Sequence, residues 1–437
     1  MAKLNTPKGT RDFLPQQAAR RNYIFDTIRG VFDTYGFAPI ETPAMELTET
    51  LMGKYGEEGD RLIFKVLARG EKLKKAVENN RVEQSSEEAL RYDLTVPFAR
   101  FVVQHQNELS FPFKRYQIQP VWRADRPQKG RYREFYQCDV DMIGSNSLLN
   151  EVELTQIIAD VFEKLGLPDV AIKINNRKIL QGIAEVIGEP EKLIDITVAL
   201  DKLDKIGREK VEEELITKGI SADAISKLGV LFENVSLESV SEFVSASEVG
   251  LKGIEELKNV INSAEKLGVS ICEFDPTLAR GLNYYTGAIF EVVHPEFPSS
   301  ICGGGRYDDL TGIFGLKDVS GVGVSFGADR IYDLLLDKEL FPAQVGLSAQ
   351  VLFVNFGDKE AAQCQLWAKE LRSAGIRTEV YPDSAKMKKQ MKYANDKSIP
   401  YVLLVGDREI EAQEPTVKNM ETGDQSAMSI IELINKL

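Results

Sequence analysis

The sequence contains very few of the residues that most metal sites and nucleophilic mechanisms use. Only two of its 437 residues are histidines, His105 and His294, and its four cysteines form no CxxC pair. Two histidines exclude a three-histidine metal site, and scattered cysteines predict reduced thiols rather than zinc ligands or disulfides. Both histidines are interpreted as structural or surface residues. We therefore expect chemistry that uses arginines and carboxylates.

Long apolar segments are also missing. No apolar run approaches the ~18 residues that a membrane-spanning helix needs, and MAKLNTPKGTRDFLP lacks the apolar core of a signal peptide. With 54 Lys+Arg against 67 Asp+Glu, the net charge of −13 argues against broad nonspecific binding to nucleic acid, although a local basic channel remains compatible with it. We expect a cytoplasmic protein without a membrane partner, built from two or three domains.

One stretch departs from this acidic character. RADRPQKGRYREFYQCDVD (residues 123–141) places five cations within its first eleven residues, with Asp125 as the only acid among them, and then becomes acidic. The strand-like segments FPFKRYQIQPVW and FYQCDVDMIG flank the basic turn. Because side chains alternate faces along a strand, the spacing predicts an antiparallel hairpin centred near Gln128 with one polar face.

The polar face of this hairpin combines three kinds of group. Cations lie near the turn, Phe135 lies between, and carboxylates lie further along, the polar set being Arg115, Gln117, Gln119, Arg123, Arg133, Phe135, Gln137, Asp139 and Asp141. Guanidinium forks match phosphate oxygens, an aromatic ring stacks on a flat base, and carboxylates hold a cationic or hydrogen-donating group. A solvated sheet face with a charged turn is the simpler alternative.

The composition changes along the chain in a way that predicts domains. Residues 178–265 are charged and helical in character, whereas strand-like and glycine-rich segments precede and follow them. This pattern predicts a core at 1–177 and 266–338 that is interrupted by a helical insertion at 178–265. After a break near 339–348, strands and helices alternate, which predicts a small α/β domain at 348–437.

Several segments together resemble a known family. GFAPIETPAM, the hairpin and GVGVSFGADR resemble the three signature motifs of class II aminoacyl-tRNA synthetases. LARGLNYYTG and GGGRYDDL resemble segments of histidyl-tRNA synthetases, and RYDLTVPFAR resembles their eukaryotic and archaeal style. The resemblance covers nearly the whole chain. It implies an α+β catalytic core, formed by an antiparallel sheet flanked by helices, with a helical insertion and a C-terminal α/β anticodon-binding domain.

The resemblance implies roles in catalysis and ATP binding. Arg123 would contact the α-phosphate of ATP and the substrate carboxylate, and Arg280 would be the family's catalytic arginine. Phe135 and Arg330 would sandwich the adenine, while Arg131 would reach the outer phosphates. Such fixed cations cancel the repulsion between two anionic reactants without a protein nucleophile.

The resemblance also implies a histidine site. Its residues would be those that bind the ammonium or carboxylate group or meet the imidazole: Asp93, Thr95, Arg123, Gln137, Asp141, Arg280, Tyr284 and Tyr285. Selectivity would come from pairing Asp141 with a tyrosine hydroxyl, because an analogue without ring nitrogens would leave both groups unpaired. Taken alone, Asp141 in a strand is equally consistent with a structural hydrogen-bond acceptor.

Contacts with tRNA and with a second subunit are further implications. Gln128 would read the acceptor end, and Pro43 would lie at a homodimer interface. SAKMKKQMKYANDK is a basic segment with an interleaved tyrosine, and Lys388, Lys389 and Lys392 within it would contact the anticodon arm. A solvated helix face is the alternative for this segment.

These implications predict a histidine–tRNA ligase. ATP, L-histidine and a histidine-accepting tRNA would be its substrates, with Mg²⁺ bound to ATP and no protein-held metal or zinc. The alternative is a non-catalytic relative of the synthetases that regulates another enzyme or senses RNA.

Overall fold

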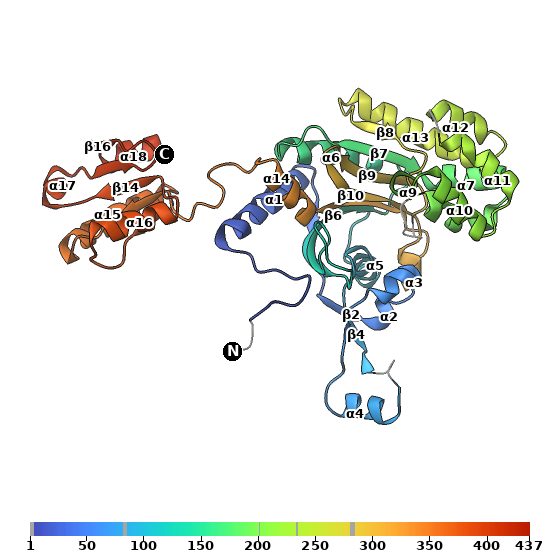
Figure 1. Ribbon diagram of the computed structural model, residues 1–437, viewed down its shortest axis with the longest axis horizontal. Helices are drawn as coiled ribbons and strands as arrows, with labels where there is room; N and C mark the ends of the chain where they lie inside the picture. The colour runs from blue at the N-terminus through green and yellow to red at the C-terminus, as the bar shows by residue number, and fades with distance from the viewer. Residues whose placement is uncertain (1–3, 82–84, 201, 233–234, 280–284) are drawn as a thin grey trace. The chain divides into compact units, whose positions relative to one another are not determined.

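The computed structural model describes residues 4–81, 85–200, 202–232, 235–279 and 285–437 (Figure 1). The chain divides into two compact units, Met1–Asp12 with Arg21–Leu340 and Phe13–Arg20 with Phe341–Leu437. Within the described ranges, every helix is too short or too polar to cross a membrane.

The larger unit is built around one eight-stranded sheet. Its strands lie in the order β1 (Ala38–Pro39), β5 (Phe113–Trp122), β6 (Glu134–Ile143), β11 (Gly321–Gly327), β10 (Phe297–Tyr307), β9 (Ala288–His294), β7 (Ala171–Asn176) and β8 (Cys272–Phe274). Neighbours pair antiparallel except at the two edges, where β1 with β5 and β7 with β8 are parallel. The predicted α+β fold is confirmed, with a sheet that is mixed rather than purely antiparallel.

The β5–β6 hairpin has the predicted register. Arg115 lies opposite Asp141, and Gln117 lies opposite Asp139, so the hairpin is symmetric about Gln128. The alternation of polar and apolar side chains therefore puts the polar groups of both strands on one face, as expected. The opposite face carries Tyr116, which packs under a helix.

Two long helices cover that apolar face. α1 (Pro15–Thr34) buries apolar side chains at helical spacing, and α6 (Leu149–Lys164) lies against β11. The Phe326 ring of β11 lies 5.8 Å from the ring of Phe32 in α1 and 5.7 Å from that of Phe162 in α6. Burial of these aromatic rings stabilises the helix–sheet layer and leaves the other face of the sheet for polar groups.

Shorter elements belong to the same unit. These are β2 (Met45–Leu47), β3 (Lys65–Val66) and β4 (Glu88–Leu90), which form a small sheet, and α2 (Thr48–Leu51), α3 (Gly56–Arg61), α4 (Glu71–Glu78), α5 (Thr95–Gln104) and α14 (Ala328–Asp337). Buried Phe98 and Val102 of α5 join Ile143 and Tyr307 of the large sheet in one apolar cluster. This packing places the first turn of α5 beside the polar sheet face.

A group of helices follows β7. They are α7 (Arg177–Val186), α8 (Leu193–Leu200), α9 (Leu203–Ile206), α10 (Arg208–Thr217), α11 (Ala222–Leu228), α12 (Leu237–Phe243) and α13 (Glu248–Lys266). α7 and α13 pack at glycines, because a Cβ on Gly182 would lie 2.5 Å from Gly250 Cα. The helical character expected for residues 178–265 is thus present in the structure.

The smaller unit contains a five-stranded sheet in the order β13-β12-β14-β15-β16. Its elements are β12 (Val351–Phe353), α15 (Asp358–Ser373), β13 (Thr378–Val380), α16 (Met387–Asp396), β14 (Tyr401–Leu404), α17 (Asp407–Ala412), β15 (Thr416–Asn419), β16 (Gln425–Ala427) and α18 (Ile430–Lys436). β12 pairs parallel with both β13 and β14, which confirms the predicted α/β pattern.

Candidate active site

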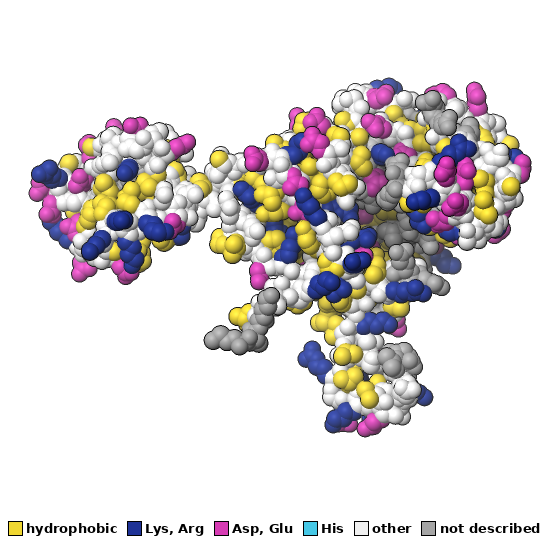
Figure 2. All heavy atoms as spheres, viewed as in Figure 1, with side chains coloured by type: hydrophobic (Ala, Val, Ile, Leu, Met, Phe, Trp, Pro, Cys, Tyr) yellow, Lys and Arg dark blue, Asp and Glu magenta, His cyan; other side chains and the backbone are white. Residues whose placement is uncertain are grey.

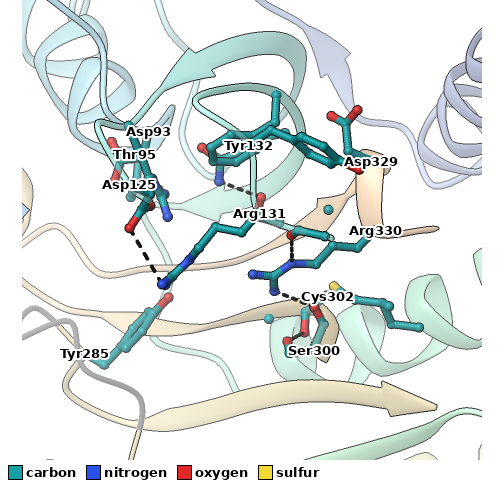
Figure 3. A pocket seen from close by; sticks show the side chains of 18 residues that line it. Asp93, Thr95, Asp125, Arg131, Tyr132, Tyr285, Ser300, Cys302, Asp329 and Arg330 are labelled. Carbon is teal, nitrogen blue, oxygen red and sulfur yellow. Dashed lines mark hydrogen bonds and ion pairs between the residues drawn. The ribbon is translucent and has the colours of Figure 1, made fainter. Parts of the chain in front are cut away.

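A cleft opens on the polar face of the sheet, and eight of the predicted site residues line it. They come from the β5–β6 hairpin, the region around the start of α5, the segment before β9 and the start of α14: Asp93, Thr95, Arg123, Arg131, Phe135, Gln137, Tyr285 and Arg330. In Figure 3, Arg131 and Arg330 project into the same hollow as Asp93, Thr95 and Tyr285. The fold therefore brings together groups that are up to 237 positions apart in the sequence, from Asp93 to Arg330.

Arg123 is held rigidly at the end of β5. Its backbone N–H donates to the carbonyl oxygen of Arg133 at 3.0 Å, and its Nε donates to the carbonyl oxygen of Tyr92 at 3.0 Å. The guanidinium carbon lies 4.2 Å from the Tyr92 ring centroid and 5.2 Å from the Phe135 ring centroid. A cation fixed in this way is preorganised for an anionic ligand.

Two acceptors lie near Arg123. Asp93 is 3% exposed, and its Oδ1 accepts hydrogen bonds from the Tyr55 hydroxyl and the Val96 N–H. Burial raises the pKa of Asp93, and Arg123 opposes that rise. Gln137 donates through Nε2 to Ser325 Oγ at 2.8 Å, whereas its buried Oε1 has no hydrogen-bond partner among the described residues. Both side chains thus offer oxygens to a cationic ligand.

Arg330 lies in the first turn of α14 and is fixed by two backbone carbonyls. Its Nε donates to Gly130 at 3.0 Å, and its Nη1 donates to Ser300 at 2.6 Å. Gly130 has φ +72°, a left-handed conformation that favours glycine. These bonds hold the flat guanidinium in the wall of the cleft that Phe135 also lines.

A smaller cavity adjoins the cleft and shares Thr95, Tyr285, Gly303 and Ser325 with its lining. Asp141 lines it and receives a hydrogen bond from the Tyr307 hydroxyl at 2.7 Å. The fully buried guanidinium of Arg115 forms an ion pair with Asp141, with Nη2 and Oδ2 2.7 Å apart. These interactions make the cavity a polar chamber, which is called the inner chamber below.

Asp139 lies beside Asp141 on the same strand and lines the same cavity. Burial raises the pKa of Asp139 to about 7; Arg115 lowers it, and Asp141 raises it. Burial also raises the pKa of Asp141, again opposed by Arg115. Two carboxyl groups thus share one buried guanidinium, so the chamber favours a further hydrogen donor or cation.

Glycines make room for the chamber. A Cβ on Gly323 would lie 1.9 Å from Asp141 Oδ1, and a Cβ on Gly304 would lie 2.0 Å from the Gly323 carbonyl oxygen. Any side chain at these positions would displace the carboxylate or separate β10 from β11. The glycine-rich segment therefore serves tight backbone packing here.

Comparisons with known proteins identify the family of the chain. The family model described as "Histidyl-tRNA synthetase" matches residues 9–331, and the one described as "Anticodon binding domain" matches residues 350–437. A histidine–tRNA ligase of Christiangramia forsetii is 59% identical over 97% of each chain. The chain belongs to the histidyl-tRNA synthetase family.

Further histidyl-tRNA synthetases support the assignment. A histidine–tRNA ligase of Phocaeicola vulgatus is 57% identical, over 99% of this chain and 98% of that protein. A crystal structure of a histidyl-tRNA synthetase from Nostoc sp. PCC 7120 matches with a TM-score of 0.86 and 31% identity, over 100% of this chain and 99% of that one. The similarity thus includes the C-terminal α/β domain as well as the catalytic core.

The remaining predicted residues lie elsewhere or cannot be placed. Arg280 and Tyr284 lie outside the described residues. Gln128 is in the hairpin loop, where its N–H donates to the Arg131 carbonyl at 3.0 Å. Pro43 lines a separate groove formed by residues 41–47, Glu88 and part of α5.

The predicted lysines form part of a cationic surface on the smaller unit. Lys388, Lys389 and Lys392 are exposed on α16. Figure 2 shows cationic side chains on the part of this unit where Figure 1 labels α16. Lys392 forms an ion pair with Asp396, so only part of this charge is balanced within the helix.

Sequence reasoning did not select Arg115, Asp139 or Tyr307 as site residues. The first two were already on the predicted polar face of the hairpin, so strand parity was a usable signal. Tyr307 gave no such signal, because it is 166 residues from the Asp141 that it contacts.

Proposed function

We propose that the cleft joins L-histidine to ATP, releases pyrophosphate, and then transfers histidine to the 3′ end of its tRNA. The observation that carries the proposal is the convergence of Arg123, Asp93, Gln137 and Arg330 on one cleft. Family membership supports the same reaction. Family membership also favours an enzyme over the regulatory or RNA-sensing alternative. The relatives at 59% and 57% identity are histidine–tRNA ligases, and the similarity extends over nearly their full length.

The activation step brings two anions together. Arg123, immobilised by Tyr92, would lie between the histidine carboxylate and the α-phosphate and would stabilise the charge that develops in the transition state. Positioning replaces nucleophilic catalysis, since the carboxylate itself attacks phosphorus. Arg280 is assigned the role of a second catalytic cation. Arg131 is assigned contact with the outer phosphates.

Recognition of histidine would use both cavities. The orphaned Oε1 of Gln137, with Asp93 and Thr95, would accept hydrogen bonds from the ammonium group in the cleft. The imidazole would enter the chamber lined by Asp141 and Tyr285. We also assign Tyr284 a role in meeting the imidazole. An amino acid without ring nitrogens would leave these buried groups unpaired and would be rejected by a factor of roughly 10⁴.

The nucleotide would lie between Phe135 and Arg330 with its phosphates toward Arg123 and Arg131. Mg²⁺ would enter with ATP and be held chiefly by phosphate oxygens, which suits its hard, oxygen-preferring chemistry. The carboxylate of Asp125 lines the same cleft and pairs with Arg131, with Oδ1 and Nη1 3.7 Å apart, so no protein ligand to the ion is assigned. The ion would supply charge neutralisation on the outer phosphates.

The same proposal covers the organisation of the chain. The catalytic core would comprise 1–177 and 266–338, with the insertion at 178–265 and the anticodon-binding domain at 348–437. A cytoplasmic homodimer would form through the groove beside Pro43, where Met45 and Leu47 are 48% and 52% exposed. Gln128 would approach the acceptor end of tRNA, and α16 would contact its anticodon arm.

Amino-acid-dependent exchange of labelled pyrophosphate into ATP tests the proposal. Each of the twenty amino acids is supplied in turn, with and without Mg²⁺. Exchange confined to histidine, followed by histidine transfer to tRNA, is the expected result. Binding of histidine or tRNA without any exchange would favour the regulatory or RNA-sensing alternative.

A further inference from the structure

The N-terminal strap, residues 7–11, lies on the loop of the β5–β6 hairpin. The carbonyl oxygen of Gly9 accepts a hydrogen bond from the Arg133 N–H at 2.9 Å. Gly9 has φ +86°, and a Cβ there would lie 2.8 Å from side-chain carbons of both Pro127 and Arg133. Glycine is therefore required for the strap to approach the loop so closely.

Arg11 connects the strap to two other elements. Its guanidinium carbon lies 3.3 Å from the Tyr132 ring centroid, so the cation stacks on a ring that lines the cleft. The same guanidinium forms an ion pair with Asp329 at the start of α14. Arg21 Nη2 lies 3.9 Å from the same Asp329 oxygen and adds a second positive charge.

Asp329 uses its other oxygen to hold β6. Oδ2 accepts a hydrogen bond from the Tyr136 N–H at 2.9 Å, and the Asp329 side chain is only 6% exposed. Tyr136 directly follows Phe135, and Asp329 directly precedes Arg330. The Asp329 carboxylate thus bonds to the neighbour of Phe135, and Asp329 is itself the neighbour of Arg330. Phe135 and Arg330, the two residues proposed to hold the adenine, lie on different elements.

We propose that Arg11 and Asp329 are positioning residues that set the separation of Phe135 and Arg330 and thereby determine the affinity for the nucleotide. The inference rests on the proposed function. Charge-assisted hydrogen bonds are stronger and shorter than neutral ones, so the Arg11–Asp329 pair can hold β6 and α14 at a fixed spacing. On the histidine side of the cleft, the described hydrogen bonds are made to other residues: Asp93 accepts from Tyr55 and Val96, Gln137 donates to Ser325, and Asp141 accepts from Tyr307.

The first experiment separates nucleotide binding from histidine binding. Arg11→Ala and Arg11→Lys are compared with the wild type in pyrophosphate exchange, varying ATP and histidine separately. We expect Arg11→Ala to raise the KM for ATP about tenfold, because small displacements of positioning groups are costly, with the KM for histidine unchanged. Arg11→Lys keeps the charge but loses the flat stacking, so it should recover part of the loss.

A second pair of variants tests the role of the Asp329 carboxylate in holding β6. Asp329→Asn keeps an oxygen that can accept from Tyr136, whereas Asp329→Ala removes it. We expect the KM for ATP to rise less for the Asn variant than for the Ala variant. Arg29→Ala, which breaks an ion pair with Asp26 on α1, is the matched control and should leave both KM values unchanged.

Three outcomes would overturn the inference. They are an unchanged KM for ATP in folded Arg11→Ala, an equal rise in both KM values, or equal effects of the two Asp329 variants. Thermal melting verifies folding, and if Arg11→Ala does not fold, Arg11→Lys and Asp329→Asn decide by the same KM comparison. Failure of the wild type to exchange with histidine would instead contradict the proposed function.

Discussion

The two units of the chain bury very different kinds of polar group. In the larger unit the buried side chains include Arg91, Asp93, Arg115, Asp139, Asp141, Glu151, Arg306 and Asp329. In the smaller unit the buried polar side chains within the described residues are all uncharged: Asn355, Thr378 and Gln390. Gln390 accepts from the Asn355 N–H and donates to the Asn355 carbonyl, each at 2.8 Å, which satisfies it locally.

We infer that this difference reflects the ligands proposed for each unit. Burying a charge costs more than its ion pair usually returns, so a domain that only needs a stable core avoids it. In the larger unit, Asp93, Asp139, Asp141 and Asp329 line the cleft or its inner chamber, where charged and polar substrates would complete the network. The other buried charges, such as the Arg306–Glu151 pair, are satisfied within the protein. The smaller unit carries its charges on the surface, as suits contact with a phosphate backbone.

Among the tests of this comparison, breaking a buried ion pair of the larger unit should have the largest effect, a loss in the free energy of unfolding. Arg306 Nε and Nη2 lie 2.5 and 2.6 Å from the two oxygens of Glu151, which is fully buried. Arg306→Met would strand that carboxylate and lower the free energy of unfolding by about 3–5 kcal/mol. Urea unfolding measures this loss.

The matched variant in the smaller unit is Lys392→Met, which breaks the exposed pair with Asp396. We expect no measurable change in its unfolding, because exposed pairs contribute little. Similar losses in the two variants would remove the proposed distinction between the units.

Removing the central cation of the cleft should give the next largest effect. Arg123→Ala should lower the rate of pyrophosphate exchange by roughly 10²–10³, because a preorganised charge is lost from the transition state. The exchange rate of Arg123→Lys should lie between those of the wild type and Arg123→Ala, since lysine keeps the charge but lacks the planar fork. Filter binding should show unchanged tRNA affinity, whereas equal losses in both assays would indicate a general folding defect.

Asp139 should give the larger unit a pH-dependent stability. Its pKa is raised to about 7 in the folded protein, against about 3.9 in an unfolded chain. Between these values the folded form retains a proton that the unfolded form has lost. The free energy of unfolding should therefore fall as the pH rises from about 4 to about 7, by up to about 1.4 kcal/mol per pH unit.

Asp139→Asn should reduce this slope, as measured by urea unfolding at several pH values. The raised pKa values of Asp93 and Asp141 contribute the part that remains. The exposed Asp396→Asn is the control and should leave the slope intact. A slope that persists unchanged in Asp139→Asn would show that another group titrates.

The smallest effect is expected at the surface of the smaller unit. Replacing Lys388, Lys389 and Lys392 by alanine should raise the KM for tRNA and leave pyrophosphate exchange unchanged. The salt dependence of tRNA binding should weaken by roughly one unit of slope for each phosphate that a lysine no longer neutralises. A charge-matched control in the same unit removes Lys359, Lys369 and Lys436, and an equal effect there would favour the solvated-face alternative for α16.

Much of the hairpin could be predicted from local pattern. The alternation of polar and apolar residues predicted that Arg115, Gln117 and Asp141 share a face, and the register agrees. The choice of partners could not be predicted in the same way. The described partners of Asp141, Arg115 and Tyr307, were not predicted. The expected pairing of Asp141 with Tyr284 or Tyr285 stays a prediction, because Tyr284 lies outside the described residues.

Local sequence by itself determined the hairpin, the helical character of residues 178–265, the alternation of strands and helices in the smaller unit and the family resemblance, because these depend on periodicity and on residues near one another in the chain. Only the tertiary structure decided which buried charges meet, since Arg11 with Asp329 and Arg306 with Glu151 are separated by 318 and 155 positions. The physical reason is desolvation: a charge inside the protein must find a partner in space, and no local pattern records where that partner will be.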